Sequence, residues 1–136
     1  MTRAVIDTSV LVSALIGSPS AGPALVVEAV RNRRLTFVAS PGLLDELAVV
    51  LARPKFDRWT AERRGARYLT ALAANAELHP DLPDPPQITR DIDDDYLVAL
   101  AVSASADVIV SLDLDLLDAQ LPIRCVTPAQ LVELLV

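Results

Sequence analysis

The sequence predicts an α/β protein in which a parallel sheet is covered by helices on both faces. Two observations predict this fold class. Short apolar runs that read as strands alternate with helical segments along the chain, and each of these runs is continuously apolar, which is typical of strands buried on both faces. The chain has 136 residues and is 52% hydrophobic, the size and composition of one ordinary folded domain. We therefore expect a single domain over residues 1–136.

Four short apolar runs are expected to form strands, and the segments between them to form helices. The strands are 4–7, 35–39, 107–112 and 123–126. The helices are 9–17, 24–32, 42–52, about 57–76, 94–105, a short turn near 114–119, and 128–135. Caps mark two helix starts: Ser40 precedes Pro41, and Thr127 precedes Pro128 with Gln130 at the capping-box position. Residues 80–93 hold four prolines and are expected to form a loop.

The charges are unevenly distributed along the chain. The formal net charge is −6, which alone argues against nucleic-acid binding. However, nine of the twelve basic residues lie between Arg31 and Arg67, and ten of the eighteen acidic residues lie between Asp81 and Asp118. An acidic pocket beside a basic collar suits an enzyme that holds a divalent metal and grips a polyanion. Two solvated faces of opposite charge are the alternative interpretation.

The compartment is predicted from features that the sequence lacks. No apolar run approaches the roughly 20 residues needed to span a bilayer. Asp7 interrupts the apolar N-terminal stretch, so a signal peptide is not expected. Cys125 is the only cysteine, which excludes an internal disulfide and a cysteine-rich zinc site. We expect a cytoplasmic protein.

Acidic residues occur where sites form in an open parallel sheet, at the carboxyl ends of the strands. Asp7 ends the first strand, and Asp113 and Asp115 directly follow the strand 107–112. Glu46 lies in the helix after the second strand. A further cluster precedes the helix that leads into strand 107–112: Asp91, Asp93, Asp94 and Asp95. Four separate segments are thus expected to bring carboxylates to one edge of the sheet.

Each acid also has a purely structural interpretation. Asp7 could cap the following helix, Glu46 could be a solvated helix residue, and Asp113 and Asp115 could be turn residues favoured by the helix dipole. The helical periodicity places Glu46 at the margin of an apolar stripe, from which it can reach inward.

The same periodicity separates the acids of the cluster. It places Asp94 on the apolar side of its helix, about 60° from Leu97, and Asp95 roughly opposite. Asp91 and Asp93 are expected to shape or cap the entry to this helix. Asp94 is therefore the preferred site residue of the cluster, and Asp95 is its rival.

Converging carboxylates repel one another unless a cation lies among them. Hard oxygen ligands with no cysteine or histidine nearby favour Mg²⁺ or Mn²⁺ over zinc. Such a site, with one or two ions, can activate water and stabilise the charge on a phosphodiester during in-line attack. Other chemistries lack their residues, because His79 is the only histidine and no G-x-S-x-G elbow or Gly-rich phosphate loop is present.

Three segments resemble the PIN-domain family, and in particular the toxin branch of VapBC-like toxin–antitoxin pairs. They are VIDTSVLVSAL (5–15), SPGLLDELAVVLARPKF (40–56) and RDIDDDYLVALAVSASADVIVSLDLDLL (90–117), and in order they cover essentially the whole chain. The resemblance implies a metal-dependent ribonuclease. It also implies a three-layer α/β/α sandwich with a central parallel sheet of four to five strands.

The resemblance carries site roles onto individual residues. The family's first aspartate falls on Asp7, the glutamate of its second helix on Glu46 and its fourth acid on Asp113. The third acid falls on Asp94 with the spacing of this branch, or on Asp95 in a gapless comparison with the shorter toxin branch. The remaining positions carry supporting side chains or an accessory acid: Thr8, Ser9, Ser111 and Asp115. Leu112 stands where the family has glycine.

These residues lead to a functional hypothesis. We expect Asp7, Glu46, Asp94 and Asp113 to hold one or two Mg²⁺ or Mn²⁺ ions. The resemblance implies that single-stranded RNA is cleaved to leave 5′-phosphate and 3′-hydroxyl ends. Candidates for gripping the RNA backbone, or for contacting an acidic antitoxin segment, are the basic residues Arg53, Lys55, Arg58, Arg63, Arg64 and Arg67. The resemblance also implies a homodimer. A non-catalytic protein-binding module of the same fold and a structure-specific DNA nuclease are the alternatives.

Overall fold

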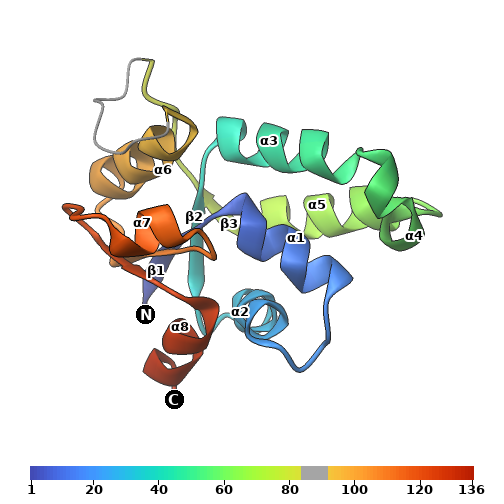
Figure 1. Cartoon of the computed structure of the whole chain (residues 1–136), viewed down its shortest axis with the longest axis horizontal. Helices are drawn as coiled ribbons and strands as arrows, with labels where there is room; N and C mark the ends of the chain where they lie inside the picture. The colour runs from blue at the N-terminus through green and yellow to red at the C-terminus, as the bar shows by residue number, and fades with distance from the viewer. Residues whose placement is uncertain (84–91) are drawn as a thin grey trace.

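A five-stranded parallel sheet lies at the centre of the protein (Figure 1). The computed structural model describes residues 1–83 and 92–136. The strands are β1 (Arg3–Ile6), β2 (Thr36–Ala39), β3 (Ala76–Leu78), β4 (Val108–Val110) and β5 (Arg124–Val126). Their order in the sheet is β3-β2-β1-β4-β5, and every neighbouring pair is parallel. The predicted α/β fold with a parallel sheet is confirmed.

Helices cover both faces of this sheet. They are α1 (Thr8–Ile16), α2 (Gly22–Arg31), α3 (Pro41–Leu51), the 3-10 helix η1 (Pro54–Phe56), α4 (Asp57–Thr60), α5 (Arg64–Ala74), α6 (Ile92–Ser103), α7 (Leu114–Asp118) and α8 (Pro128–Leu134). α1 packs against α2 and α3, and α3 packs against α5, whereas α6 packs against β1 and β4. Figure 1 shows α1, α3 and α5 on one side of the strands and α6 and α7 on the other. None of the helices in the described part of the chain has the length and apolar character that a bilayer-spanning helix needs.

The central strands and the helix faces turned towards them form the core. Val5, Ile6 and Ile109 on the strands, and Leu43 and Leu47 on α3, are completely buried. Burial of a large aliphatic side chain contributes about 1.5–3 kcal/mol each. The two elements that carry Asp7 and Glu46 are therefore rigidly anchored.

The predicted helix caps are confirmed by their hydrogen bonds. Ser40 Oγ accepts from the backbone N–H of Leu43 at 3.2 Å, with Pro41 as the first residue of α3. At α8, Thr127 Oγ1 accepts from the N–H of Gln130 at 3.1 Å, and the Gln130 side chain accepts from the N–H of Thr127 at 2.9 Å. Two orphan amides are thus satisfied reciprocally, as in a capping box.

The helix predicted over 57–76 is wrong in its extent. It breaks between α4 and α5, where Glu62 and Arg63 have φ values of 57° and 65°, in the left-handed region that an α-helix cannot include. Its last residue, Ala76, belongs instead to the edge strand β3, which pairs with β2. This strand has three residues and leaves Leu78 57% exposed, so it has no continuous apolar run by which it could be predicted.

The loop predicted over 80–93 overlaps the part of the chain that the structure leaves undescribed. Residues 84–91, including Asp91, lie outside the described residues. α6 begins at Ile92, two residues before the predicted start. Asp93 therefore belongs to the first turn of α6, although it was expected to precede the helix.

The strand order reverses between β1 and β4, and this position determines where the site lies. From β1 the chain moves to β2 and β3 on one side, whereas β4 and β5 lie on the other side. In open parallel sheets such a switch point leaves a crevice at the carboxyl ends of the strands. Here those ends lead into Asp7 and Ser111, and the N–H of Asp7 donates to the carbonyl of Val110 at 2.9 Å.

Candidate functional site

Asp7 occupies the residue after β1 and the N-cap position of α1, but its side chain does not cap the helix. Its carboxylate instead accepts from Ser111 Oγ at 2.8 Å and, on the other oxygen, from Thr8 Oγ1 at 3.4 Å. The residue is only 8% exposed. The interpretation of Asp7 as a simple helix cap is therefore wrong, because Oδ2 is directed across the switch point to Ser111 at the end of β4 and neither oxygen accepts from a helix N–H.

Ser111 connects the two strand ends that meet at the switch point. Its side chain is completely buried, and its Oγ donates to Asp7 while accepting from the backbone N–H of Asp113 at 2.9 Å. Ser9 Oγ accepts from the N–H of the neighbouring Leu112 at 3.5 Å. The two serines thus hold the β4–α7 connection against the start of α1.

Leu112, which stands in the place of a glycine, does not strain this connection. The non-glycine residues with positive φ in the described part of the chain are Arg33, Glu62, Arg63 and Ser105. Leu112 therefore has a backbone conformation that any residue adopts. Its side chain is 43% exposed and leaves the backbone before Asp113 in place.

Asp113 is the N-cap of α7 and follows Ser111 by two residues. Its Oδ1 accepts from the N–H of Asp115 at 2.9 Å. The side chain of Asp113 is half-buried, whereas Asp115 is exposed in the first turn of α7. The Asp113 side chain thus acts as a turn residue through Oδ1, as expected. The backbone N–H of Asp113 donates to Ser111 Oγ, so the residue also lies beside the Asp7–Ser111 pair.

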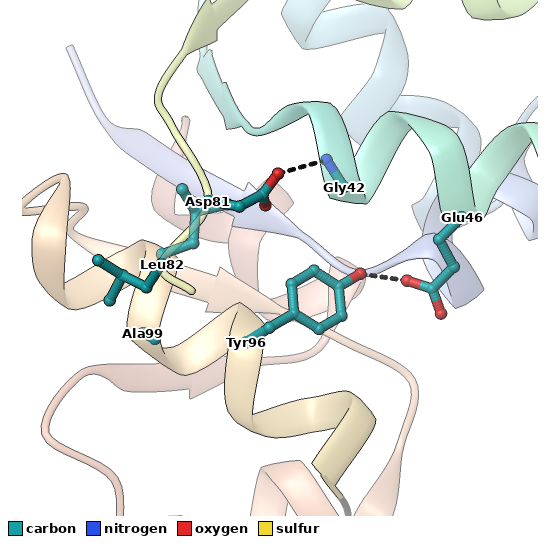
Figure 2. A pocket seen from close by; sticks show the side chains of 7 residues that line it. Gly42, Glu46, Asp81, Leu82, Tyr96 and Ala99 are labelled. Atoms are coloured by element: carbon teal, nitrogen blue, oxygen red, sulfur yellow. Dashed lines mark hydrogen bonds between the residues drawn. The ribbon is translucent and has the colours of Figure 1, made fainter. Parts of the chain in front are cut away.

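Glu46 extends from the middle of α3 towards α6, where the Tyr96 hydroxyl donates to its Oε2 (Figure 2). The pKa of Tyr96 is raised above its ordinary value by burial, by the hydrogen bond to Glu46, and by the negative charges of Asp7 and Asp81. Carboxylates from three segments thus lie around this hydroxyl. Tyr96 and Asp81 are site residues that the sequence analysis missed.

Asp94 and Asp95 are the third and fourth residues of α6, and both are buried, with 9% and 2% exposure. The expectation that Asp95 projects away from the apolar side is wrong, because α6 is buried on most of its faces; Leu97, Val98 and Leu100 are at most 3% exposed. Burial alone therefore does not separate the two acids.

Cys125 on β5 lies within electrostatic range of Asp94 and of two other acids. Burial, together with the negative charges of Asp7, Asp113 and Asp94, raises the pKa of its thiol to about 11. The charges of these three carboxylates therefore all act on the Cys125 thiol. No local pattern around Cys125 predicts that the charges of these acids act on its thiol.

Comparison with known proteins identifies the family. The family described as PIN domain matches residues 3–115. The chain belongs to the PIN-domain family. A solved structure with a similar fold is the crystal structure of PAE2754 from Pyrobaculum aerophilum. It has a TM-score of 0.60 to this chain at 18% sequence identity, and the alignment covers 98% of this chain and 95% of that one. At this identity the likeness shows the fold alone. No match is found among curated proteins.

Membership of the PIN-domain family has a general consequence for activity. The PIN-domain family commonly includes metal-dependent nucleases, which are hydrolases. PIN domains typically use divalent metal ions. The match covers α1, α3, α6 and the Asp113–Asp115 segment. It therefore includes all the acids that the sequence analysis selected.

All candidate metal ligands of this PIN domain are carboxylates, and carboxylate oxygens are the ligands that hard divalent cations such as Mg²⁺ and Mn²⁺ prefer. Among the residues that the structure describes, however, no three His, Cys, Asp or Glu side chains form a group close enough to hold one metal ion. Glu46 is directed to Tyr96 and Asp113 to the start of α7. In the described part of the chain, the candidate acids therefore do not form a ligand cluster in this structure.

The basic residues form a second surface, which we call the basic collar, beyond the end of α3. All six are exposed: Arg53, Lys55, Arg58, Arg63, Arg64 and Arg67. They lie on or beside η1, α4 and the start of α5, and Figure 1 shows α4 at the end of α3 remote from β2. At 1.5 Å per residue, Arg53 lies about 10 Å along the helix axis beyond Glu46. The basic collar therefore lies beyond the end of α3 and is separate from the acidic edge.

Proposed function

We propose that the protein is a Mg²⁺- or Mn²⁺-dependent endoribonuclease that cleaves single-stranded RNA. The observation that supports this most strongly is the carboxylate of Asp7, which is 8% exposed and held by Ser111 rather than by its own helix. A buried, oriented carboxylate is the kind of ligand that a divalent cation stabilises.

In this proposal Asp7, Glu46, Asp94 and Asp113 hold one or two ions, with Asp95 as the alternative to Asp94 and Asp115 as an accessory acid. A bound divalent cation neutralises charge on the phosphodiester and increases the acidity of water. The chain itself positions the ligands. Ser111 fixes one Asp7 oxygen, and the Tyr96 hydroxyl orients Glu46.

The basic collar is proposed to bind the RNA backbone on one side of the cleavage position. Its positive charges begin about 10 Å along α3 from Glu46, a distance that a few nucleotides of extended single strand can span. The Arg64 guanidinium already donates two hydrogen bonds within the protein, to the carbonyls of Ala61 and Arg58 at 3.0 and 2.9 Å. Fewer of its N–H groups are therefore available to contact RNA. RNA affinity should therefore fall with rising salt, as it does when phosphate contacts release counterions.

The test is cleavage of an end-labelled single-stranded RNA with Mn²⁺. The wild-type protein should cleave, EDTA should abolish cleavage, and Asp7→Asn and Asp113→Asn should each remove it while the proteins remain folded by circular dichroism. Asp45→Asn is the matched control, because Asp45 is exposed on α3 beside Glu46 and carries the same charge. Equal cleavage in EDTA would refute the role of the metal.

The same assay separates the alternative functions. Preference for flap DNA over RNA would support a structure-specific DNA nuclease. Binding of a protein partner with no cleavage of any nucleic acid would support a non-catalytic module. Sequencing the 5′ ends of cellular RNA after induced expression would identify the target and show whether the ends carry 5′-phosphate.

We further propose that this nuclease is the cytoplasmic toxin of a toxin–antitoxin pair, forms a homodimer and is covered by an acidic segment of an antitoxin at the basic collar. The complementary charges support this last proposal. Arrest of growth on expression, dependent on Asp7, would support the toxin role. Growth unaffected by an active nuclease would contradict it.

A further inference from the structure

A cavity of about 370 Å³ opens next to Glu46, between α3, α6 and the segment that follows β3 (Figure 2). Its lining includes Gly42, Glu46, Asp81, Leu82, Tyr96 and Ala99. The volume lies in the range of small-molecule sites, roughly 300–1,000 Å³. Because Glu46 belongs both to this cavity and to the acidic edge, a group bound here lies beside the reacting part of the substrate.

The walls of the cavity combine an aromatic ring with aliphatic side chains. Tyr96 and Ala99 come from α6, and Leu82 comes from the segment after β3 (Figure 2). Leu82 is 43% exposed, although it is aliphatic. Flat apolar walls with an aromatic ring suit a nucleobase, since stacking on aromatic side chains stabilises binding of single-stranded nucleic acids.

The polar groups of the cavity are chiefly hydrogen-bond acceptors. Asp81 Oδ2 accepts from the backbone N–H of Gly42 at 2.8 Å, at the start of α3. A Cβ added at Gly42 would lie 2.8 Å from Asp81 Oδ1, so the carboxylate packs directly against the backbone of Gly42. The Tyr96 hydroxyl is itself donating to Glu46. A neutral ligand must therefore present donors to Asp81.

We propose that this cavity is a base-recognition subsite that takes a guanine next to the cleaved phosphodiester, with its N1–H and N2–H donors directed to Asp81. The inference rests on the proposed ribonuclease function and adds a sequence preference to it. Guanine alone presents two adjacent donors on its Watson–Crick edge, which match the two oxygens of a carboxylate. Uracil presents one donor between two acceptors, and adenine and cytosine place an acceptor beside their amino group.

Binding can be measured independently of cleavage. The trinucleotides UGU, UAU, UCU and UUU, which carry equal charge, are titrated in EDTA and the amide signals of Gly42 and Ala99 are followed by NMR. UGU should bind about tenfold more tightly than the others, the discrimination typical of one bidentate base contact. Replacing its guanine by inosine, which lacks the amino group, should remove most of this difference. Equal or absent responses would overturn the inference.

Asp81→Asn is the decisive variant. Asparagine keeps a carbonyl oxygen for the Gly42 N–H but replaces the second acceptor with a donor, so the preference for UGU should disappear. Asp45→Asn should retain it. A response to an arginine amide but to none of the trinucleotides would also overturn the inference, since the cavity would then take a cationic side chain.

Cleavage distinguishes failure of this inference from failure of the proposed function. Metal-dependent cleavage next to guanine, with the preference lost in Asp81→Asn, supports both. Metal-dependent cleavage with no base preference overturns the subsite and leaves the ribonuclease. Absence of cleavage refutes the ribonuclease, and the trinucleotide titration then still decides whether the cavity binds guanine.

Discussion

Replacing Ser111 by alanine should destabilise the protein and disorder its acidic edge. The serine is completely buried; it donates to Asp7 at 2.8 Å and accepts from the Asp113 N–H at 2.9 Å. A hydrogen bond to a charged group contributes about 1.5–3 kcal/mol and a neutral one about 1 kcal/mol. Losing both should lower the free energy of unfolding by about 2–4 kcal/mol.

Urea denaturation of wild type, Ser111→Ala and Ser111→Thr measures this cost. Threonine retains the hydroxyl and should recover most of the loss. Ser103→Ala is the matched control, since Ser103 is exposed on α6 and its replacement should change stability by less than about 0.5 kcal/mol. Mn²⁺ affinity should also fall about 10–100-fold in Ser111→Ala, as when a partner of a metal ligand is removed. Unfolding and Mn²⁺ binding both equal to wild type would refute the role given to Ser111.

Two further predictions concern other polar contacts. Hydrogen bonds from Arg3 and then His79 lower the pKa of Glu77 from 4.5 to about 2, so its stabilising effect is complete above pH 4.5 and is lost as the pH falls towards 2. Glu77→Gln should flatten this part of the stability profile, and an unchanged slope between pH 5 and pH 2.5 would contradict the assignment. Gly42→Ala should destabilise the protein, because its Cβ would lie 2.8 Å from Asp81. With Asp81→Ala present, the same change should become neutral or stabilising by up to about 1 kcal/mol; additive effects in this double-mutant cycle would contradict the contact.

Most of the fold could be predicted because its signals are local. The continuous apolar runs at β1, β2 and β4, and the caps at Ser40 and Thr127, lie within a few residues of the elements that they define. β3 could not be predicted, since three partly exposed residues form a strand only through pairing with β2. The break before α5 depends on left-handed residues, Glu62 and Arg63, which carry no sequence signal comparable to glycine.

The candidate site was predictable only where topology determines it. Asp7 and Asp113 follow strands that the sequence identifies, so the parallel sheet alone brings them to one edge. Tyr96 meets Glu46 across fifty positions of the chain, and no periodicity within either helix predicts that contact. Asp95 is buried by the packing of α6 as a whole, which a single helical wheel does not represent.

Calorimetric titration with Mn²⁺ tests most directly whether the acidic edge is a metal centre. The wild-type protein should bind one or two ions, and Asp7→Asn and Asp113→Asn should each weaken binding by more than about tenfold. Asp45→Asn, which alters an exposed acid on the same helix as Glu46, should bind as the wild type does. Mn²⁺ binding that is absent from the wild type, or that is equal in Asp7→Asn, would contradict the proposed metal-dependent nuclease.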